Sequence, residues 1–170
     1  MSNVSFVAID PSISATGVSR ISKSESSDLY KVERVDTVTC GSRRFPNRWE
    51  KKVKMSLLFK NLIETHYSDC KFAVFENYSY GSPGQLADLG EMNGLFKYIL
   101  SANNIPFETI TPNEVKKIIT GKGNADKDLV QKSVEKFMEK KIVFKGYDES
   151  DSVAVGIAYA IKMRGIINES

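Results

Sequence analysis

The spacing of apolar residues changes along this chain, and that change limits the folds it can adopt. Near the start, apolar residues form a short run from Val4 to Asp10 and then alternate with polar residues from Thr16 to Ile21, as in β-strands. From Arg48 they recur mainly at helical spacing, interrupted by two short apolar runs, Phe72–Glu76 and Phe107–Ile110. We therefore expect strands first, and then helices that alternate with two more strands.

The predicted strands favour one mixed sheet. A third strand is expected over Leu29–Thr39, and polar turns at Asp10-Pro11-Ser12 and Ser22–Asp28 would join the first three strands as an antiparallel meander. The later two strands are each reached through a helix, which favours parallel pairing. The expected fold class is α/β, with a mixed five-stranded sheet of three antiparallel and two parallel strands flanked by helices. No shift in composition marks a linker, so residues 1–170 are expected to form a single domain.

Helical spacing predicts five helices. They span residues 48–65, 86–102, 112–120, 125–140 and 148–163. The third has the clearest start, because Thr111 is a good N-cap, Pro112 suits the first position and Glu114 completes a capping box. Asn124 is expected to cap the fourth helix.

A basic stretch surrounds the start of the first predicted helix. Its members are Arg43, Arg44, Arg48, Lys51, Lys52 and Lys54. We expect a solvated helix face here, with a DNA-binding arm as the alternative.

Composition and charge narrow the class of protein. The net charge of +3 is mildly basic, which is compatible with nucleic-acid binding. No apolar run approaches the roughly 20 residues that a membrane-spanning helix needs, and Met1 leads into a strand-like run rather than a signal peptide. Cys40 and Cys70 lack the spacing of a metal site or of a disulfide framework. These features predict a protein of the reducing cytoplasm with no membrane partner.

Four acidic residues stand at the ends of apolar segments. Asp10 and Glu76 end two predicted strands, whereas Asp148 and Asp151 open the last predicted helix, where a spacing of three places them on one face. Buried carboxylates are costly unless they are paired, and Mg²⁺ takes such oxygen ligands. If the two strands are adjacent and parallel, the four acids meet at one sheet edge and form a two-metal site suited to phosphodiester chemistry.

Each acid also has a structural interpretation. Asp10 before Pro11 is common in turns, and Glu76 suits the solvent end of a strand. Asp148 and Asp151 suit the cap and first turn of a helix. The set of four is more informative than any member, but spacing alone leaves both interpretations open.

Five short motifs resemble, in their order, those of one known family. They are Ala8-Ile9-Asp10-Pro11-Ser12 with Thr16-Gly17, Phe75-Glu76-Asn77, Leu89 to Gly94, Val115 to Lys127, and Asp148 to Ala154. The chain resembles the RuvC-type Holliday junction resolvases of the RNase H-like and retroviral-integrase superfamily, which has viral (phage) members. The resemblance covers nearly the whole chain and implies a single RNase H-like nuclease domain.

The resemblance implies a role for each matched acid. Asp10, Glu76, Asp148 and Asp151 would be the catalytic residues and would bind two Mg²⁺ ions, with Mn²⁺ as a substitute. Since the only histidine, His66, matches no motif position, the implied chemistry has no histidine base.

The resemblance also implies residues that contact DNA. Lys116 and Lys127 match basic residues near the scissile phosphate, and Lys122 is a further phosphate contact with weaker support. Tyr78 and Tyr80 lie one position away from an aromatic residue that stacks on bases in relatives, so packing within the loop is their alternative.

Two glycines one helical turn apart, Gly90 and Gly94, match the helix that forms a two-fold dimer interface in the family. The resemblance therefore implies a homodimer, which suits a four-way junction that is itself roughly two-fold. Close packing of these glycines against the chain's own sheet is the alternative.

The expected function is an Mg²⁺-dependent endonuclease that resolves four-way DNA junctions in recombination and repair, in the cytoplasm or, for a viral member, the host cytoplasm. One alternative is a broader nuclease that cuts flaps and forks. Another is a DNA-binding module without catalysis, which the four intact acids disfavour. A sugar-kinase or actin-like domain is disfavoured because those folds need a second similar domain and more than 170 residues.

Overall fold

The computed structural model describes residues 5–77 and 83–168. Its sheet has five strands in the order β3-β2-β1-β4-β5. The strands are β1 (Phe6–Asp10), β2 (Ala15–Lys23), β3 (Tyr30–Thr39), β4 (Ala73–Glu76) and β5 (Phe107–Ile110). Strands β1, β2 and β3 pair antiparallel, whereas β1, β4 and β5 pair in parallel. The mixed sheet predicted from the sequence is therefore confirmed.

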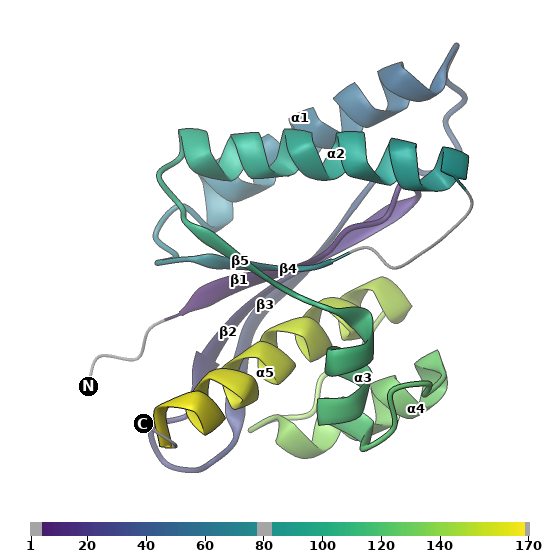
Figure 1. The fold of residues 1–170 in the computed structure, drawn as a ribbon. Coiled ribbons are helices and arrows are strands. Elements are labelled where there is room, and N and C mark those ends of the chain that lie inside the picture. The colour runs from purple at the N-terminus through teal and green to yellow at the C-terminus, as the bar shows by residue number, and fades with distance from the viewer. Residues whose placement is uncertain (1–4, 78–82, 169–170) are drawn as a thin grey trace.

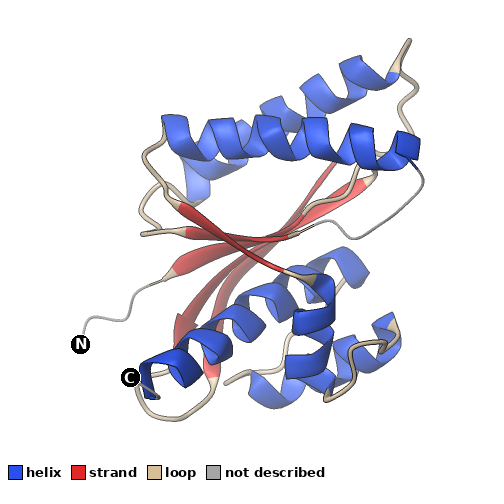
Figure 2. Ribbon diagram, viewed as in Figure 1, coloured by secondary structure: helices blue, strands red, loops and turns tan. Residues whose placement is uncertain are grey.

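Helices cover both faces of the sheet, giving three layers (Figures 1 and 2). Helices α1 (Arg48–His66) and α2 (Pro83–Ala102) lie on one face. The other face carries α3 (Pro112–Thr120), α4 (Lys127–Val134) and α5 (Tyr147–Asn168). Each layer has its own apolar core, because alternate residues of the central strands point to opposite faces. In β1, for example, Ala8 belongs to the α5 side and Ile9 to the α1 side.

The apolar residues of α1 are not confined to the face that meets the sheet. Trp49 and Leu57 are 52% and 57% exposed, whereas Phe59 and Ile63 are fully buried. Phe59 stacks on Phe96 of α2 with ring centroids 4.1 Å apart. Apolar residues surround much of α1, so their spacing predicts a helix without choosing which side meets the sheet.

Two helix starts show how local chemistry sets boundaries. At α3 the predicted capping box is confirmed, since the Thr111 hydroxyl accepts from the Glu114 N–H and the Glu114 carboxylate accepts from the Thr111 N–H at 2.9 Å. At α4 the predicted cap, Asn124, is wrong, because Asp126 accepts the capping hydrogen bond from Leu129 N–H at 2.8 Å.

The predicted helix over 125–140 is too long. After α4 ends at Val134, the chain continues as a 3₁₀ turn, η1 (Glu135–Phe137), and then becomes extended. Met138 pairs with Tyr30 at the start of β3. This pairing ends the helical run although apolar residues continue beyond it.

No helix between residues 5 and 77 or between 83 and 168 is long and apolar enough to cross a bilayer.

Candidate functional site

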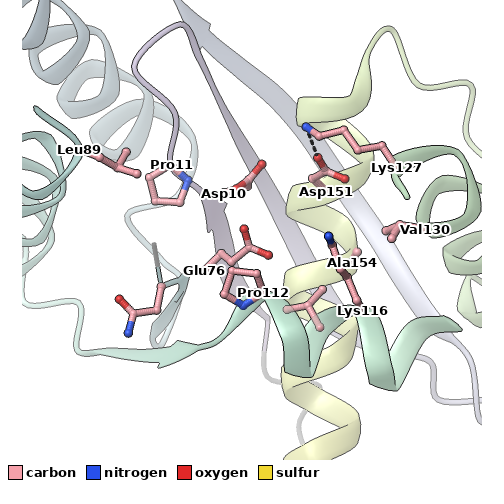
Figure 3. A pocket seen from close by; sticks show the side chains of 12 residues that line it. Asp10, Pro11, Glu76, Leu89, Pro112, Lys116, Lys127, Val130, Asp151 and Ala154 are labelled. Atoms are coloured by element: carbon pink, nitrogen blue, oxygen red, sulfur yellow. Dashed lines mark hydrogen bonds and ion pairs between the residues drawn. The ribbon is translucent and has the colours of Figure 1, made fainter. Parts of the chain in front are cut away.

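A cavity of about 280 Å³ opens where β1 and β4 end. Segments from both helical layers enclose it, and acidic and basic side chains point into it together (Figure 3). The lining residues are Asp10, Pro11, Glu76, Asn77, Leu89, Pro112, Val115, Lys116, Lys127, Val130, Asp151 and Ala154.

Two of the predicted acids meet because their strands are parallel neighbours. Ile9 of β1 lies opposite Phe75 of β4, so Asp10 and Glu76, the next residue of each strand, reach the same edge of the sheet. Their carboxyl groups lie near each other (Figure 3), and each affects the pKa of the other. The sequence-based expectation that these strands are adjacent and parallel is confirmed.

Burial and mutual repulsion alter the protonation of this pair. Each residue as a whole is partly exposed, but the two carboxyl groups are turned inward. Burial raises the pKa of Asp10 well above its usual value, and the charges of Glu76 and Asp151 raise it further. Burial also raises the pKa of Glu76 to about 7, although its hydrogen bond with Asp10 opposes the change. Near neutral pH the pair therefore retains a proton unless a cation neutralises it.

The third acid comes from α5 and is held by a lysine. Asp151 has only 16% of its side chain exposed, and Lys127 Nζ at the start of α4 donates to its Oδ2 at 3.0 Å. Burial raises the pKa of Asp151 even though Lys127 opposes the change. Partial burial acts to lower the pKa of Lys127, but the hydrogen bond and charge of Asp151 outweigh it, and the pKa is raised.

Asp148 lies at the rim of this arrangement. It is half-buried in the first turn of α5 and is not among the residues that line the cavity. Its charge still acts on Asp151 and Lys127. The next residue, Glu149, is buried and accepts a hydrogen bond from Lys145 N–H at 2.8 Å, so its carboxylate is already engaged away from the cavity.

The acids surround the cavity rather than converge on one point. Among the residues that the structure describes, no three acidic, histidine or cysteine side chains are gathered closely enough to hold a metal ion. Asp151 is paired with Lys127 instead.

Of the three lysines predicted to bind DNA, two line the cavity and one does not. Lys116 of α3 and Lys127 line the cavity, whereas Lys122 is exposed in the turn between α3 and α4 and does not. That turn follows Gly121, whose left-handed φ of 79° ends α3. The positions of Tyr78 and Tyr80 fall outside the described residues.

The structure distinguishes the two interpretations of the glycine pair on α2 for Gly94 but not for Gly90. Gly94 is exposed, and a Cβ placed there would meet no atom within 4 Å. Close packing against the chain's own sheet is therefore wrong for Gly94. Gly90 is half-buried.

One residue of the basic stretch is not on a solvated face. Only 4% of the Lys52 side chain is exposed, and its Nζ donates to Asp88 Oδ1 at 2.8 Å and to Glu91. Arg48 donates to the same Asp88 at 2.8 Å. These ion pairs join α1 to α2, so Lys52 stabilises the helical layer and is not available as part of a DNA-binding arm.

Asn77 and Leu89 line the cavity, although the sequence placed them only within motifs and predicted no role for either. Asn77 directly follows Glu76, and its N–H donates to Ile110 of β5 at 2.7 Å. The signal in the sequence that could have indicated the position of Asn77 is that it is a polar residue next to the strand-end acid Glu76. The place of Leu89 depends on the approach of α2 and has no comparable local signal.

Comparison with known families gives one match over most of the chain. The family model for the crossover junction endodeoxyribonuclease RuvC matches residues 6–159. A RuvC from Brachyspira hyodysenteriae is 31% identical over 160 residues, which cover 93% of this chain and 94% of the relative. A RuvC from Orientia tsutsugamushi is 31% identical over 162 residues, with 93% and 96% covered.

Solved structures share the fold at lower sequence identity. Thermus thermophilus RuvC in complex with a Holliday junction substrate has a TM-score of 0.78 and 16% identity, with 95% of each chain covered. The yeast mitochondrial Holliday junction resolvase has a TM-score of 0.59 and 14% identity, covering 91% of this chain and 78% of its own. The fowlpox virus resolvase has a TM-score of 0.55 and 12% identity, with 94% and 99% covered. The expected RNase H-like resolvase fold is thereby confirmed.

Proposed function

The chain belongs to the RuvC family of crossover junction endodeoxyribonucleases, and from that premise we propose that it resolves Holliday junctions at the cavity where β1 and β4 end. The observation that carries this proposal is that Asp10, Glu76 and Asp151 line one cavity together with Lys116 and Lys127. Acids suit the binding of metal ions and lysines suit a phosphate, so the combination fits phosphodiester hydrolysis.

The proposed metal ions are Mg²⁺, with Mn²⁺ as a substitute. The donors are all carboxylate oxygens, which hard divalent ions prefer. Burial, with a smaller effect of neighbouring negative charge, raises the pKa of Asp10 and of Glu76, and a bound cation would offset both effects. We assign Asp10, Glu76 and Asp151 as ligands, with Asp148 at the rim as the fourth. When bound, a pair of such ions supplies the positive charge that activates water and stabilises the leaving oxygen.

The lysines are proposed to act on the DNA. Lys116 and Lys127 would neutralise the scissile phosphate, whereas the exposed Lys122 would contact the backbone farther away. In the protein without DNA, Lys127 neutralises Asp151. A metal ion held by Asp151 would compete with the Lys127 ammonium for this carboxylate, and Lys127 would then be available to the phosphate. A stacking role for Tyr78 or Tyr80 is part of the proposal but does not carry it.

Cleavage of labelled DNA by matched variants tests the assignment. The substrates are a mobile four-way junction, a fork and a flap, and the variants are Asp10→Asn and, as control, Asp69→Asn, which removes an exposed acid paired with Arg20. We expect Asp10→Asn to lose at least about 100-fold in cleavage rate while still binding the junction in Ca²⁺, and Asp69→Asn to cleave as the wild type does. Unchanged cleavage by Asp10→Asn would refute the catalytic assignment, and equal cleavage of forks and flaps would favour the broader nuclease.

We also propose that the enzyme works as a homodimer through α2. Gly94 leaves an open position on the helix surface, and Tyr98, one turn later, is 73% exposed. A small residue beside an exposed aromatic gives a second helix a place to pack. A symmetric dimer would present two cavities to opposed strands of a junction.

Sedimentation of Gly94→Arg tests this interface, with Gly146→Arg as control because a Cβ at Gly146 also meets no atom within 4 Å. We expect the first variant to be monomeric and to lose paired cleavage of the junction, and the second to sediment as the wild type does. A dimeric Gly94→Arg would exclude this face of α2 as the interface.

A further inference from the structure

The first turns of α5 lie directly on β2 at Gly17. A Cβ at Gly17 would stand 1.8 Å from the backbone oxygen of Asp148 and 3.0 Å from the Cβ of Ser152. The oxygen belongs to a helical backbone and cannot rotate aside. A methyl group at Gly17 would therefore push this part of α5 outward by about 1.6 Å to restore an ordinary contact of 3.4 Å.

This contact is beside the acids of the cavity. Gly17 lies directly opposite Asp10 in the register of β1 and β2, where facing Cα atoms are about 5 Å apart. The part of α5 that rests on Gly17 also carries Asp151, which lines the cavity with Asp10 and Glu76. The depth at which α5 rests on β2 therefore sets the distance between Asp151 and the other two acids.

A second glycine, on α5 itself, also allows the helix to lie close to the sheet. A Cβ at Gly156 of α5 would stand 2.7 Å from Ile21 Cγ1 and 2.9 Å from Ala8 Cβ. These neighbours are side-chain atoms, and the overlaps are smaller than at Gly17, so a methyl group here would displace α5 less.

We propose that Gly17 is a positioning residue for the metal-binding acids, because its missing side chain lets α5 approach until Asp151 shares one cavity with Asp10 and Glu76. Gly17 has no side chain of its own, and it acts through its contact with the backbone of α5 at Asp148. This inference rests on the proposed function of the cavity.

The test measures metal binding as well as cleavage, using Gly17→Ala and Gly156→Ala. Ile157→Ala is the control, since it removes a fully buried side chain of α5 without adding an atom between helix and sheet. Calorimetry with Ca²⁺ on DNA-free protein, well below each melting temperature, reports whether the acids are still arranged around an ion. Single-turnover cleavage of a four-way junction in Mg²⁺ measures the rate of the cleavage step. Junction binding in Ca²⁺ measures the affinity for DNA separately.

For Gly17→Ala we expect Ca²⁺ affinity to fall at least tenfold and the cleavage step to slow by about 100-fold, the usual order for a misplacement of an ångström or more. Junction binding should stay within about twofold, because the lysines are on α3 and α4. Gly156→Ala should show a smaller loss of the same kind. Ile157→Ala, although less stable, should bind Ca²⁺ as the wild type does.

Wild-type Ca²⁺ affinity in Gly17→Ala would overturn the positioning role while leaving the proposed function intact. If Gly17→Ala does not fold, Gly156→Ala decides, and a Ca²⁺ affinity equal to that of Ile157→Ala would overturn the proposal. Loss of Ca²⁺ affinity in Ile157→Ala to the level of Gly17→Ala would also overturn it, because general loosening would then explain the effect. The proposed function fails by a different result, namely full cleavage by Asp10→Asn.

Discussion

Glu76 is predicted to destabilise the folded protein at alkaline pH when no divalent ion is present. Its carboxyl group is turned inward beside Asp10, and its pKa rises from 4.5 to about 7. The folded protein then holds a proton that the unfolded chain releases at lower pH. The contribution of Glu76 to stability is therefore most favourable below pH 4.5, declines as the pH rises toward 7, and levels off above that.

The size of the effect follows from the two pKa values. Each pH unit between 4.5 and about 7 changes the free energy of unfolding by about 1.4 kcal/mol. Glu76 alone should therefore lower stability by about 3 kcal/mol between pH 4.5 and pH 8. Asp10 acts in the same direction, since its pKa is also raised. Replacing Glu76 with glutamine removes the ionisable group while keeping its shape.

Urea unfolding in chelator between pH 4.5 and pH 8.5 measures this effect. We expect Glu76→Gln to be more stable than the wild type at pH 8, by up to about 3 kcal/mol, and to show a shallower decline with pH. Added Mg²⁺ should stabilise the wild type at pH 8 and the variant much less. Glu64→Gln, which changes an exposed glutamate of α1, is the matched control and should follow the wild type.

Two results would refute the reasoning. Glu76→Gln could be less stable than the wild type at pH 8 in chelator, or the two proteins could show the same dependence of stability on pH. Either outcome would contradict the effect predicted from the raised pKa of Glu76.

Three further substitutions test separate parts of the structure. Thr111→Ala removes the capping box of α3 and should cost about 1 kcal/mol in a thermal melt; no loss would mean that the cap does not stabilise the fold. Lys52→Met leaves Asp88 with one fewer partner and should cost about 2 kcal/mol, whereas Lys54→Met should stay within about 0.5 kcal/mol. Lys127→Met should slow cleavage, yet it should bind Ca²⁺ about two- to fivefold more tightly, because Asp151 loses a competing cation. The expected gain in Ca²⁺ affinity is modest because the Lys127 side chain is well exposed. Weaker Ca²⁺ binding would contradict that competition.

The local sequence pattern was sufficient to predict most of the strands and helices and the positions of two acids, Asp10 and Glu76. Asp10 and Glu76 each end an apolar run, and once their strands are parallel neighbours the strand ends must coincide. The start of α3 was equally predictable, because its capping box lies within four consecutive residues. These features depend on residues that are close in the chain.

The features that sequence reasoning missed depend on distant partners. Lys52 looks like a surface residue of α1 until α2 brings Asp88 and Glu91 to it. The helix expected to continue to residue 140 stops because Met138 pairs with β3.

The last helix shows the same limit within a single motif. A spacing of three places Asp148 and Asp151 on one side of α5, but only Asp151 lines the cavity. Helical spacing does not reveal how a helix is rotated and tilted over a sheet. Gly17 was visible as part of a motif, yet its contact with the backbone of Asp148 comes from a segment far along the chain.

The last of the cavity's acids to be synthesised is Asp151, 141 positions after Asp10. At about 5 to 20 residues per second, a ribosome takes about 7 to 28 s to cover that distance. During this interval the growing chain carries Asp10 and later Glu76, but α5 has not yet been made. A nascent or prematurely terminated chain is therefore expected to be unable to cut DNA, so that the order of synthesis itself delays nuclease activity until the sheet can receive its last helix.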